Sequence, residues 1–143
     1  MDIYTRALKL LAKRDHTEAE LRQKLEASHG EAPQDLINQL TRQNYLNDGR
    51  FAENYVLKRK ERGAIRIREE LLVRGVAPRL ADEILLSTVW PSLKQSLKVR
   101  MDDWNLRPPL HRRDAARLFR ALARLGYDED DIREEVEQLH DQQ

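Results

Sequence analysis

Four arginines in the last third of the chain recur at a spacing that suits anion binding. Arg113, Arg117, Arg120 and Arg124 follow one another at intervals of four, three and four residues. At about 100° per residue, this spacing places their guanidinium groups on one stripe of a helix. A planar guanidinium makes two-point contacts with phosphate or carboxylate groups. Because like charges at i, i+4 repel each other, the stripe predicts an anionic partner.

The sequence does not decide whether that anion belongs to another molecule or to this chain. An external phosphate or carboxylate partner would neutralise the stripe. Residues 128–141, which hold eight acidic residues against the single base Arg133, could also neutralise it from within the chain. The two interpretations do not exclude each other.

A second basic segment occupies the middle of the chain. Residues 58–74 hold seven basic residues against three acidic ones, which exceeds what the C-terminus of a helix needs to complement its dipole. Residues 107–124 hold six basic residues against one acidic residue. We expect a basic binding face made of Lys58, Arg59, Lys60, Arg62, Arg66, Arg68, Arg74, Arg112, Arg113, Arg117, Arg120 and Arg124.

Stacking on nucleic-acid bases is not predicted for this face. The aromatic residues Phe51, Tyr55 and Phe119 fall on the apolar sides of their helices and are not interleaved with the basic residues. Recognition of a single strand through its bases requires aromatic rings that are open to the bases.

Catalytic chemistry has little support in the sequence. The histidines, at positions 16, 29, 111 and 140, are scattered, and no two have the i, i+4 spacing of a helical metal pair. Glycine-rich phosphate loops are absent, and the acidic run 128–131 lacks the spacing of a calcium loop. We therefore expect no catalytic residue, metal or cofactor, and a protein that is not an enzyme.

Composition argues against a disulfide-bonded, secreted or membrane-spanning protein. Charged residues make up 36% of the 143 residues, and cysteine is absent, so disulfides play no part. The mean hydropathy is −0.79, and no apolar run approaches the roughly 20 residues that span a bilayer. The first residues lack the basic start and apolar core of a signal peptide. We expect a cytoplasmic protein that does not bind membranes.

Apolar residues recur at helical spacing nearly throughout, and no alternating strand pattern is present. The pattern predicts nine helices with short connections. Thr17 and Glu20 have the spacing of a capping box, Asp128 is placed to cap the last helix, and Gly75 and Gly126 are placed to end helices. A seventh helix is expected to begin at Pro91. The fold class is therefore all-α.

The helices also repeat. Residues 67–76 resemble residues 118–127, because in both an apolar pair four residues apart precedes a glycine at the same distance. Residues 21–40 follow the same scheme with one extra residue before Gly30. We predict an elongated, curved array of three tandem three-helix units, at residues 1–46, 47–89 and 90–143, whose neighbours share a core. The alternative is one irregular bundle whose helices look alike because glycine often ends a helix.

Three stretches of the chain carry motifs at set distances from one another. Residues 7–25 contain Arg-Asp-His-Thr-Glu-Ala-Glu-Leu-Arg-Gln-Lys-Leu after a leucine-rich helix. Residues 45–52 read Tyr-Leu-Asn-Asp-Gly-Arg-Phe-Ala, and residues 66–76 read Arg-Ile-Arg-Glu-Glu-Leu-Leu-Val-Arg-Gly-Val. Together these stretches resemble the RecX family, the regulators of bacterial RecA recombinase. Asn44 and Asn47 replace a glycine and an aspartate of the family pattern, and the turn before Arg66 keeps one glycine but loses a proline.

The resemblance implies a three-repeat all-α protein that lies in the groove of the RecA–DNA filament. Such proteins usually inhibit ATP hydrolysis and strand exchange by the recombinase, and thereby modulate DNA repair and recombination, without chemistry of their own. We expect a monomer that binds single- or double-stranded DNA weakly, without sequence preference and with a steep dependence on salt. Two other interpretations stay open: a helix-turn-helix regulator with a preferred duplex site, and a helical adaptor for another acidic protein.

Overall fold

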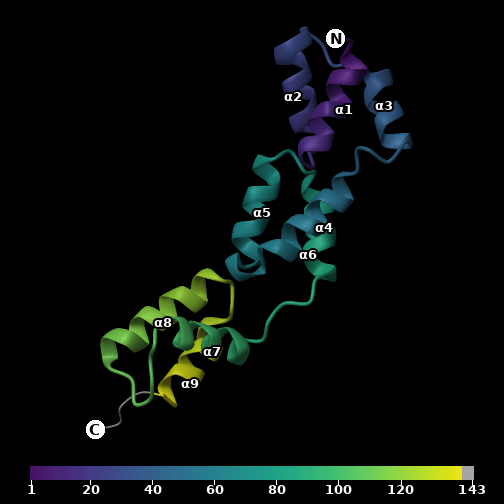
Figure 1. Cartoon of the computed structure of the whole chain (residues 1–143). Coiled ribbons are helices and arrows are strands. Elements are labelled where there is room, and N and C mark those ends of the chain that lie inside the picture. The colour runs from purple at the N-terminus through teal and green to yellow at the C-terminus, as the bar shows by residue number, and fades with distance from the viewer. Residues whose placement is uncertain (140–143) are drawn as a thin grey trace. The chain divides into compact units, whose positions relative to one another are not determined.

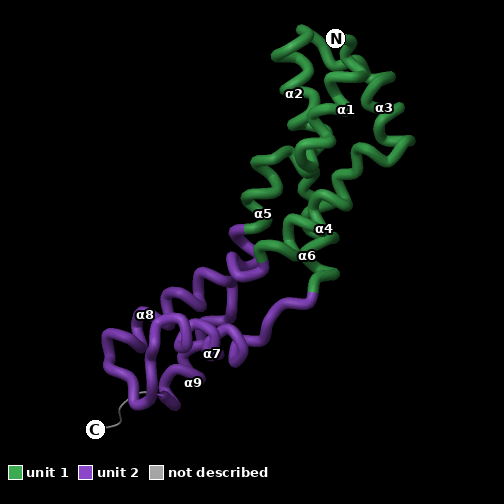
Figure 2. Tube along the Cα trace, in the orientation of Figure 1, with its two compact units in different colours: residues 1–59, 67–88 green, residues 60–66, 89–143 purple. Residues whose placement is uncertain are grey.

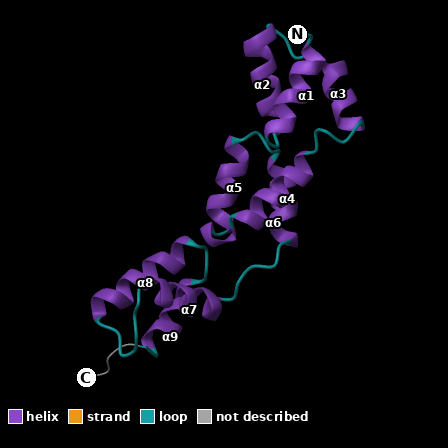
Figure 3. Ribbon diagram, in the orientation of Figure 1, coloured by secondary structure: helices purple, strands orange, loops and turns teal. Residues whose placement is uncertain are grey.

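The computed structural model describes residues 1–139, so His140 and Asp141 lie outside the described part. Within this range the chain forms nine α-helices, one short 3-10 helix and no strand (Figures 1 and 3), which confirms the all-α prediction. No helix of the described chain combines the length and apolar character needed to cross a bilayer. The helices are α1 (Ile3–Lys13), α2 (Glu18–His29), α3 (Gln34–Arg42), α4 (Asp48–Lys58), η1 (Lys60–Arg62), α5 (Ala64–Val73), α6 (Pro78–Ser87), α7 (Leu93–Asp103), α8 (Arg112–Arg124) and α9 (Glu129–Glu137).

Local capping fixes most of these boundaries. The capping box of Thr17 and Glu20 opens α2, and Gly30 ends it in the left-handed conformation at φ +75°. Asp128 accepts a hydrogen bond from the Asp131 amide at the start of α9. These boundaries were predicted because a cap depends only on neighbours in the sequence.

The predicted start of α7 at Pro91 is wrong. Ser92 is the N-cap: its hydroxyl accepts a hydrogen bond from the Gln95 amide, and the Gln95 side chain accepts one from the Ser92 amide, at 3.2 and 2.8 Å. This second capping box moves the first helical residue to Leu93. Trp90 therefore precedes the helix and does not share its apolar stripe.

The chain divides into two compact units (Figure 2). Unit 1 contains residues 1–59 and 67–88, and unit 2 contains residues 60–66 and the described chain from residue 89 onward. The first turn of α5 thus belongs to unit 2 and the rest of that helix to unit 1. The three-helix boundaries at 1–46, 47–89 and 90–143, and the elongated shape, remain predictions.

In unit 1, α1 packs on α2 and α4 packs on α6. The first three helices gather a cluster of their own, made of Ala7, Leu10, Leu21, Leu25, Leu36, Ile37, Leu40 and Leu46. The buried residues of this cluster all fall within residues 7–46, while the first two predicted triplets belong to one compact unit. The expectation of a core shared between neighbouring triplets remains a prediction. The contacts from α2 to α4 and α5, described below, include several polar ones.

In unit 2, α8 packs on both α7 and α9. The core there consists of Leu97, Met101, Leu110, Ala115, Leu118, Leu122, Ile132 and Val136. Leu118 and Leu122 are fully buried, so the apolar stripe of α8 faces this core. The arginines at positions 113, 117, 120 and 124 are exposed, as their displacement from the apolar stripe predicts.

Candidate anion-binding site

The arginines of α8 border a hollow of about 740 Å³ in unit 2, which we call the basin. Six arginines line it against one carboxylate, so its local charge is strongly positive. Its lining residues are Glu61, Arg62, Arg66, Arg100, Trp104, Arg117, Arg120, Ala121, Arg124 and Leu125.

Trp104 holds one of these arginines in place. The guanidinium carbon of Arg117 lies 3.7 Å from the centre of the Trp104 ring, and that of Arg100 lies 5.4 Å from it. A guanidinium stacked on an indole keeps its N–H edge available for an anion. Trp104 was not among the aromatic residues considered for the basic face, and its contact with Arg117 adds an aromatic ring to that face. Trp104 and Arg100 were missed because only the packing of α7 on α8 brings them together.

The carboxylates of α9 do not pair with the α8 stripe. Within residues 1–139, none of the stripe arginines forms an ion pair with α9. Glu135 of α9 lies 3.9 Å from the Lys94 amine, and Asp130 lies 2.9 Å from its own neighbour Arg133. Direct pairing with the acidic helix, the internal route to neutralisation, is thus absent from the described chain.

Residues 60–66 bring the middle basic segment to the basin. Gly63 adopts φ +82°, and a Cβ atom there would lie 2.9 Å from the backbone of Leu125. Only glycine permits this approach and this backbone angle together. The Lys60 amine donates a hydrogen bond of 2.9 Å to the Val89 carbonyl. Two residues of this segment, Arg62 and Arg66, consequently line the basin with the α8 arginines.

The other predicted residues lie elsewhere. Arg112 and Arg113 border a neighbouring hollow of unit 2 that also includes Arg117. Arg68 forms an ion pair of 2.7 Å with Asp82 in unit 1 and, through that hydrogen bond, lowers the pKa of the Asp82 carboxyl. The remaining three, Lys58, Arg59 and Arg74, line a separate cleft of unit 1.

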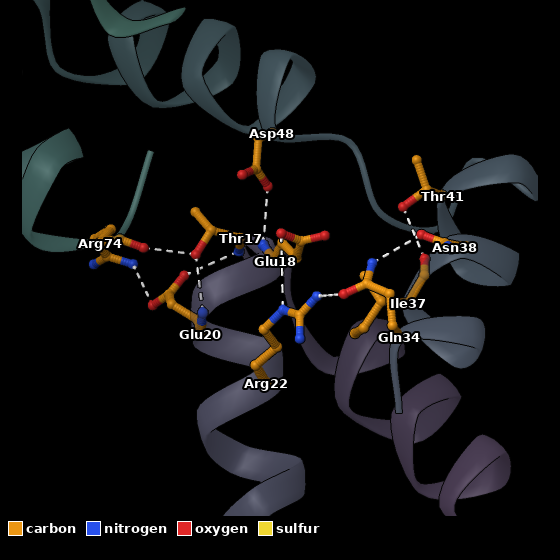
Figure 4. Close-up of polar contacts among 10 residues, drawn as sticks. All are labelled: Thr17, Glu18, Glu20, Arg22, Gln34, Ile37, Asn38, Thr41, Asp48 and Arg74. Atoms are coloured by element: carbon orange, nitrogen blue, oxygen red, sulfur yellow. Dashed lines mark hydrogen bonds and ion pairs between the residues drawn. The ribbon is translucent and has the colours of Figure 1, made fainter. Parts of the chain in front are cut away.

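The stretches that carry the family resemblance meet inside unit 1, at the start of α2 (Figure 4). The Thr17 hydroxyl donates a hydrogen bond of 2.6 Å to the Arg74 carbonyl and accepts one from the Glu20 amide. The Glu18 amide donates to Asp48 at 2.9 Å. Donors at the helix N-terminus are thereby satisfied by residues distant in sequence as well as by the local cap. The pKa of the Asp48 carboxyl is raised by its burial.

Two further residues complete this junction. Gly75 has φ +91°, and a Cβ atom there would lie 2.3 Å from the Cβ of Ala19. His16 is 3% exposed, its Nδ1 lies 2.8 Å from the Arg14 carbonyl, and its Nε2 has no partner. Burial lowers the pKa of His16. His16 thus lies buried next to the Thr17 cap of α2.

Comparison with known proteins identifies the family of this chain. The profile of the first three-helix domain of RecX matches residues 4–29, and that of the second three-helix domain matches residues 47–85. A protein of Halorhodospira halophila named regulatory protein RecX is 40% identical over 132 residues, which cover 89% of this chain and 81% of that protein.

The chain belongs to the RecX family. A second relative of the same name, from Chromohalobacter salexigens, is 37% identical over 89% of this chain and 86% of its own length. The crystal structure of RecX from Lactobacillus salivarius matches with a TM-score of 0.73 over 95% of each chain, at 20% identity. RecX proteins thus share this helical fold at low sequence identity.

Proposed function

We propose that this chain is a non-enzymatic regulator that binds the RecA–DNA filament and inhibits the recombinase. Its membership of the RecX family and the name of its relatives, regulatory protein RecX, support a regulatory role. The partner follows from the family resemblance. The chain would act by occupying the filament rather than by making or breaking a bond.

The basin is the observation on which the binding mechanism depends. Six arginines with a single lining carboxylate favour a surface that is rich in phosphate or carboxylate groups, and a nucleoprotein filament carries both. Arg117 is already oriented by Trp104, so less side-chain entropy is lost when an anion binds. Phosphate contacts of this kind carry no base information, so direct binding to free DNA should be weak and steeply salt-dependent.

Inhibition of RecA ATP hydrolysis on single-stranded DNA tests this proposal. The variant R120E/R124E reverses two basin charges that have no ion pair within the described chain and leaves Arg117 on Trp104. We expect the concentration for half inhibition to rise at least tenfold, because two charge-assisted contacts are replaced by repulsion.

The matched control is K98E/R107E, which reverses two exposed charges of unit 2 that do not line the basin. This control should inhibit as the unaltered chain does, and circular dichroism should show helical content in both variants. Equal inhibition by R120E/R124E and the control would overturn the role of the basin. A preferred duplex site in footprinting would instead favour the helix-turn-helix interpretation.

A further inference from the structure

A second cationic cleft lies in unit 1, apart from the basin. It has a volume of about 290 Å³ and combines the end of α1 with residues of α4 and the end of α5. We propose that this cleft binds a phosphate group of a nucleic-acid backbone, as a second contact that rests on the proposed function. Its lining residues are Arg14, Asp15, Phe51, Asn54, Tyr55, Lys58, Arg59 and Arg74.

The Tyr55 ring forms the platform of the cleft. It is only 6% exposed, and its hydroxyl donates a hydrogen bond of 2.9 Å to Glu70, which fixes the ring. The guanidinium carbon of Arg59 lies 3.8 Å from the ring centre, and that of Arg74 lies 5.2 Å from it. Both guanidinium groups are therefore held near one rigid ring before any ligand arrives.

A shared carboxylate positions two of the arginines. One oxygen of Glu20 lies 3.6 Å from Arg14 and 3.5 Å from Arg74. The other oxygen of Glu20 accepts a hydrogen bond from the Thr17 amide as part of the capping box. Because the single negative charge of Glu20 is shared by Arg14 and Arg74, these three side chains together keep a net positive charge. Lys58 and Arg59 add two further cations, against Asp15 as the single lining carboxylate.

The chemistry of the lining favours phosphate over an acidic peptide. Phe51 and Tyr55 are 7% and 6% exposed as residues, so the cleft offers little apolar surface to the side chains of a peptide. The covered rings also cannot stack on a base. A phosphodiester backbone needs neither contact, because it presents oxygens to guanidinium, amine and amide N–H groups, which Arg59, Lys58 and Asn54 supply.

Nuclear magnetic resonance on the full chain tests the proposal directly. The probes are the oligonucleotide (dT)6, inorganic tripolyphosphate and a hexaglutamate peptide, at equal charge and salt. We expect (dT)6 and tripolyphosphate to shift the Asn54 side-chain amide and the Arg59 Nε–H signal. The peptide should shift them at least tenfold more weakly. Shifts with hexaglutamate alone, or with none of the three, would overturn the proposal.

Variants separate this cleft from the basin. With tripolyphosphate, K58E/R59E should lose the shift of the Asn54 amide and keep the shift of the Trp104 indole N–H. R120E/R124E should lose the Trp104 shift and keep the Asn54 shift. The matched control K9E/R42E reverses one lysine and one arginine that are exposed in unit 1 outside the cleft, and should keep both shifts. Retention of the Asn54 shift in K58E/R59E, or its loss in K9E/R42E, would contradict a specific cleft. Loss of ATPase inhibition in R120E/R124E with an intact Asn54 shift would show that the two sites bind independently.

Discussion

The Thr17 hydroxyl donates a 2.6 Å hydrogen bond to the backbone carbonyl of Arg74, 57 residues away. The same oxygen accepts the amide of Glu20 at 3.1 Å, so one side chain both caps α2 and joins that helix to the end of α5. Thr17 is fully buried, and water therefore cannot replace either bond. One hydroxyl group therefore takes part in both the cap of α2 and the junction with the end of α5.

Removal of that hydroxyl should destabilise the protein strongly. Thr17→Val keeps the size and branching of the side chain but leaves the Arg74 carbonyl and the Glu20 amide without this partner. The lost cap costs about 1 kcal/mol, and a buried group left unsatisfied costs about 1–3 kcal/mol more. Urea unfolding should therefore show a loss of about 2–4 kcal/mol. Thr17→Ser, which keeps the hydroxyl, should lose much less; an equal loss in both variants would rule out the hydrogen bonds as the cause.

Substitution of two glycines should distinguish the cost of backbone strain from the cost of steric overlap. Gly30 and Gly75 both have positive φ, but a Cβ at Gly30 would meet nothing within 4 Å, whereas one at Gly75 would lie 2.3 Å from the Cβ of Ala19. Gly30→Ala should cost about 1–2 kcal/mol from the left-handed conformation alone. Gly75→Ala should cost at least about 2 kcal/mol more, since overpacking adds to the strain. Adding Ala19→Gly to Gly75→Ala should recover part of that difference in urea unfolding, and no recovery would contradict the contact.

His16 should make stability depend on pH. Its Nδ1 faces the Arg14 carbonyl and must carry the proton, so a second proton would go to the buried Nε2, which has no acceptor. Burial is the largest cause that lowers the pKa of His16 in the folded chain, and the charges of Arg14 and Lys24 add to it. The unfolded chain therefore binds this proton more readily. The contribution of neutral His16 to the free energy of unfolding should be fully present above about pH 6.5 and should be lost as the pH falls below that value.

Urea unfolding at pH 7.5 and 5.5 measures this dependence. His16→Asn can still donate to the Arg14 carbonyl but does not titrate, so it should reduce the loss of stability between the two pH values. The control His29→Asn, at an exposed position, should retain the full loss. An unchanged loss in the His16 variant would assign the pH dependence to other groups.

Trp104 should matter for binding through Arg117. Trp104→Leu keeps an apolar, though smaller, side chain and removes the aromatic face 3.7 Å from the guanidinium carbon. A cation–π contact contributes about 0.5–2 kcal/mol, so half inhibition of RecA ATP hydrolysis should need about 2- to 30-fold more protein. Trp90 does not line the basin, and Trp90→Leu serves as the matched control. Identical inhibition by both variants would leave Trp104 without a role in the basin.

Local features of this chain could be predicted from its sequence. The Thr17 cap depends on residues within one helical turn and the stripe of α8 on residues within about three turns, and the structure contains both. Contacts that depend on tertiary packing could not be predicted from the sequence. Residue spacing gives no sign that Trp104 lies against Arg117, or that the backbone of Leu125 approaches Gly63 closely enough to bring Arg62 and Arg66 to α8.

The basic residues illustrate the same limit. Their types predict anion binding, but the spatial grouping separates them into a basin in unit 2 and a cleft in unit 1. Arg68 shows why charge counting is insufficient, because Asp82 already pairs with it at 2.7 Å. The pairing of any one arginine depends on which carboxylate the fold brings near it.

Co-sedimentation with RecA filaments tests the central claim most directly. The filaments are assembled on single-stranded DNA with a nucleotide analogue that is not hydrolysed, and the bound fraction is measured for the unaltered chain, R120E/R124E and K98E/R107E. We predict that R120E/R124E binds at least about 100-fold more weakly, since two charge-assisted contacts of about 1.5–3 kcal/mol each are lost, while K98E/R107E binds as the unaltered chain does. Equal binding of all three folded proteins would contradict a basin that holds the filament.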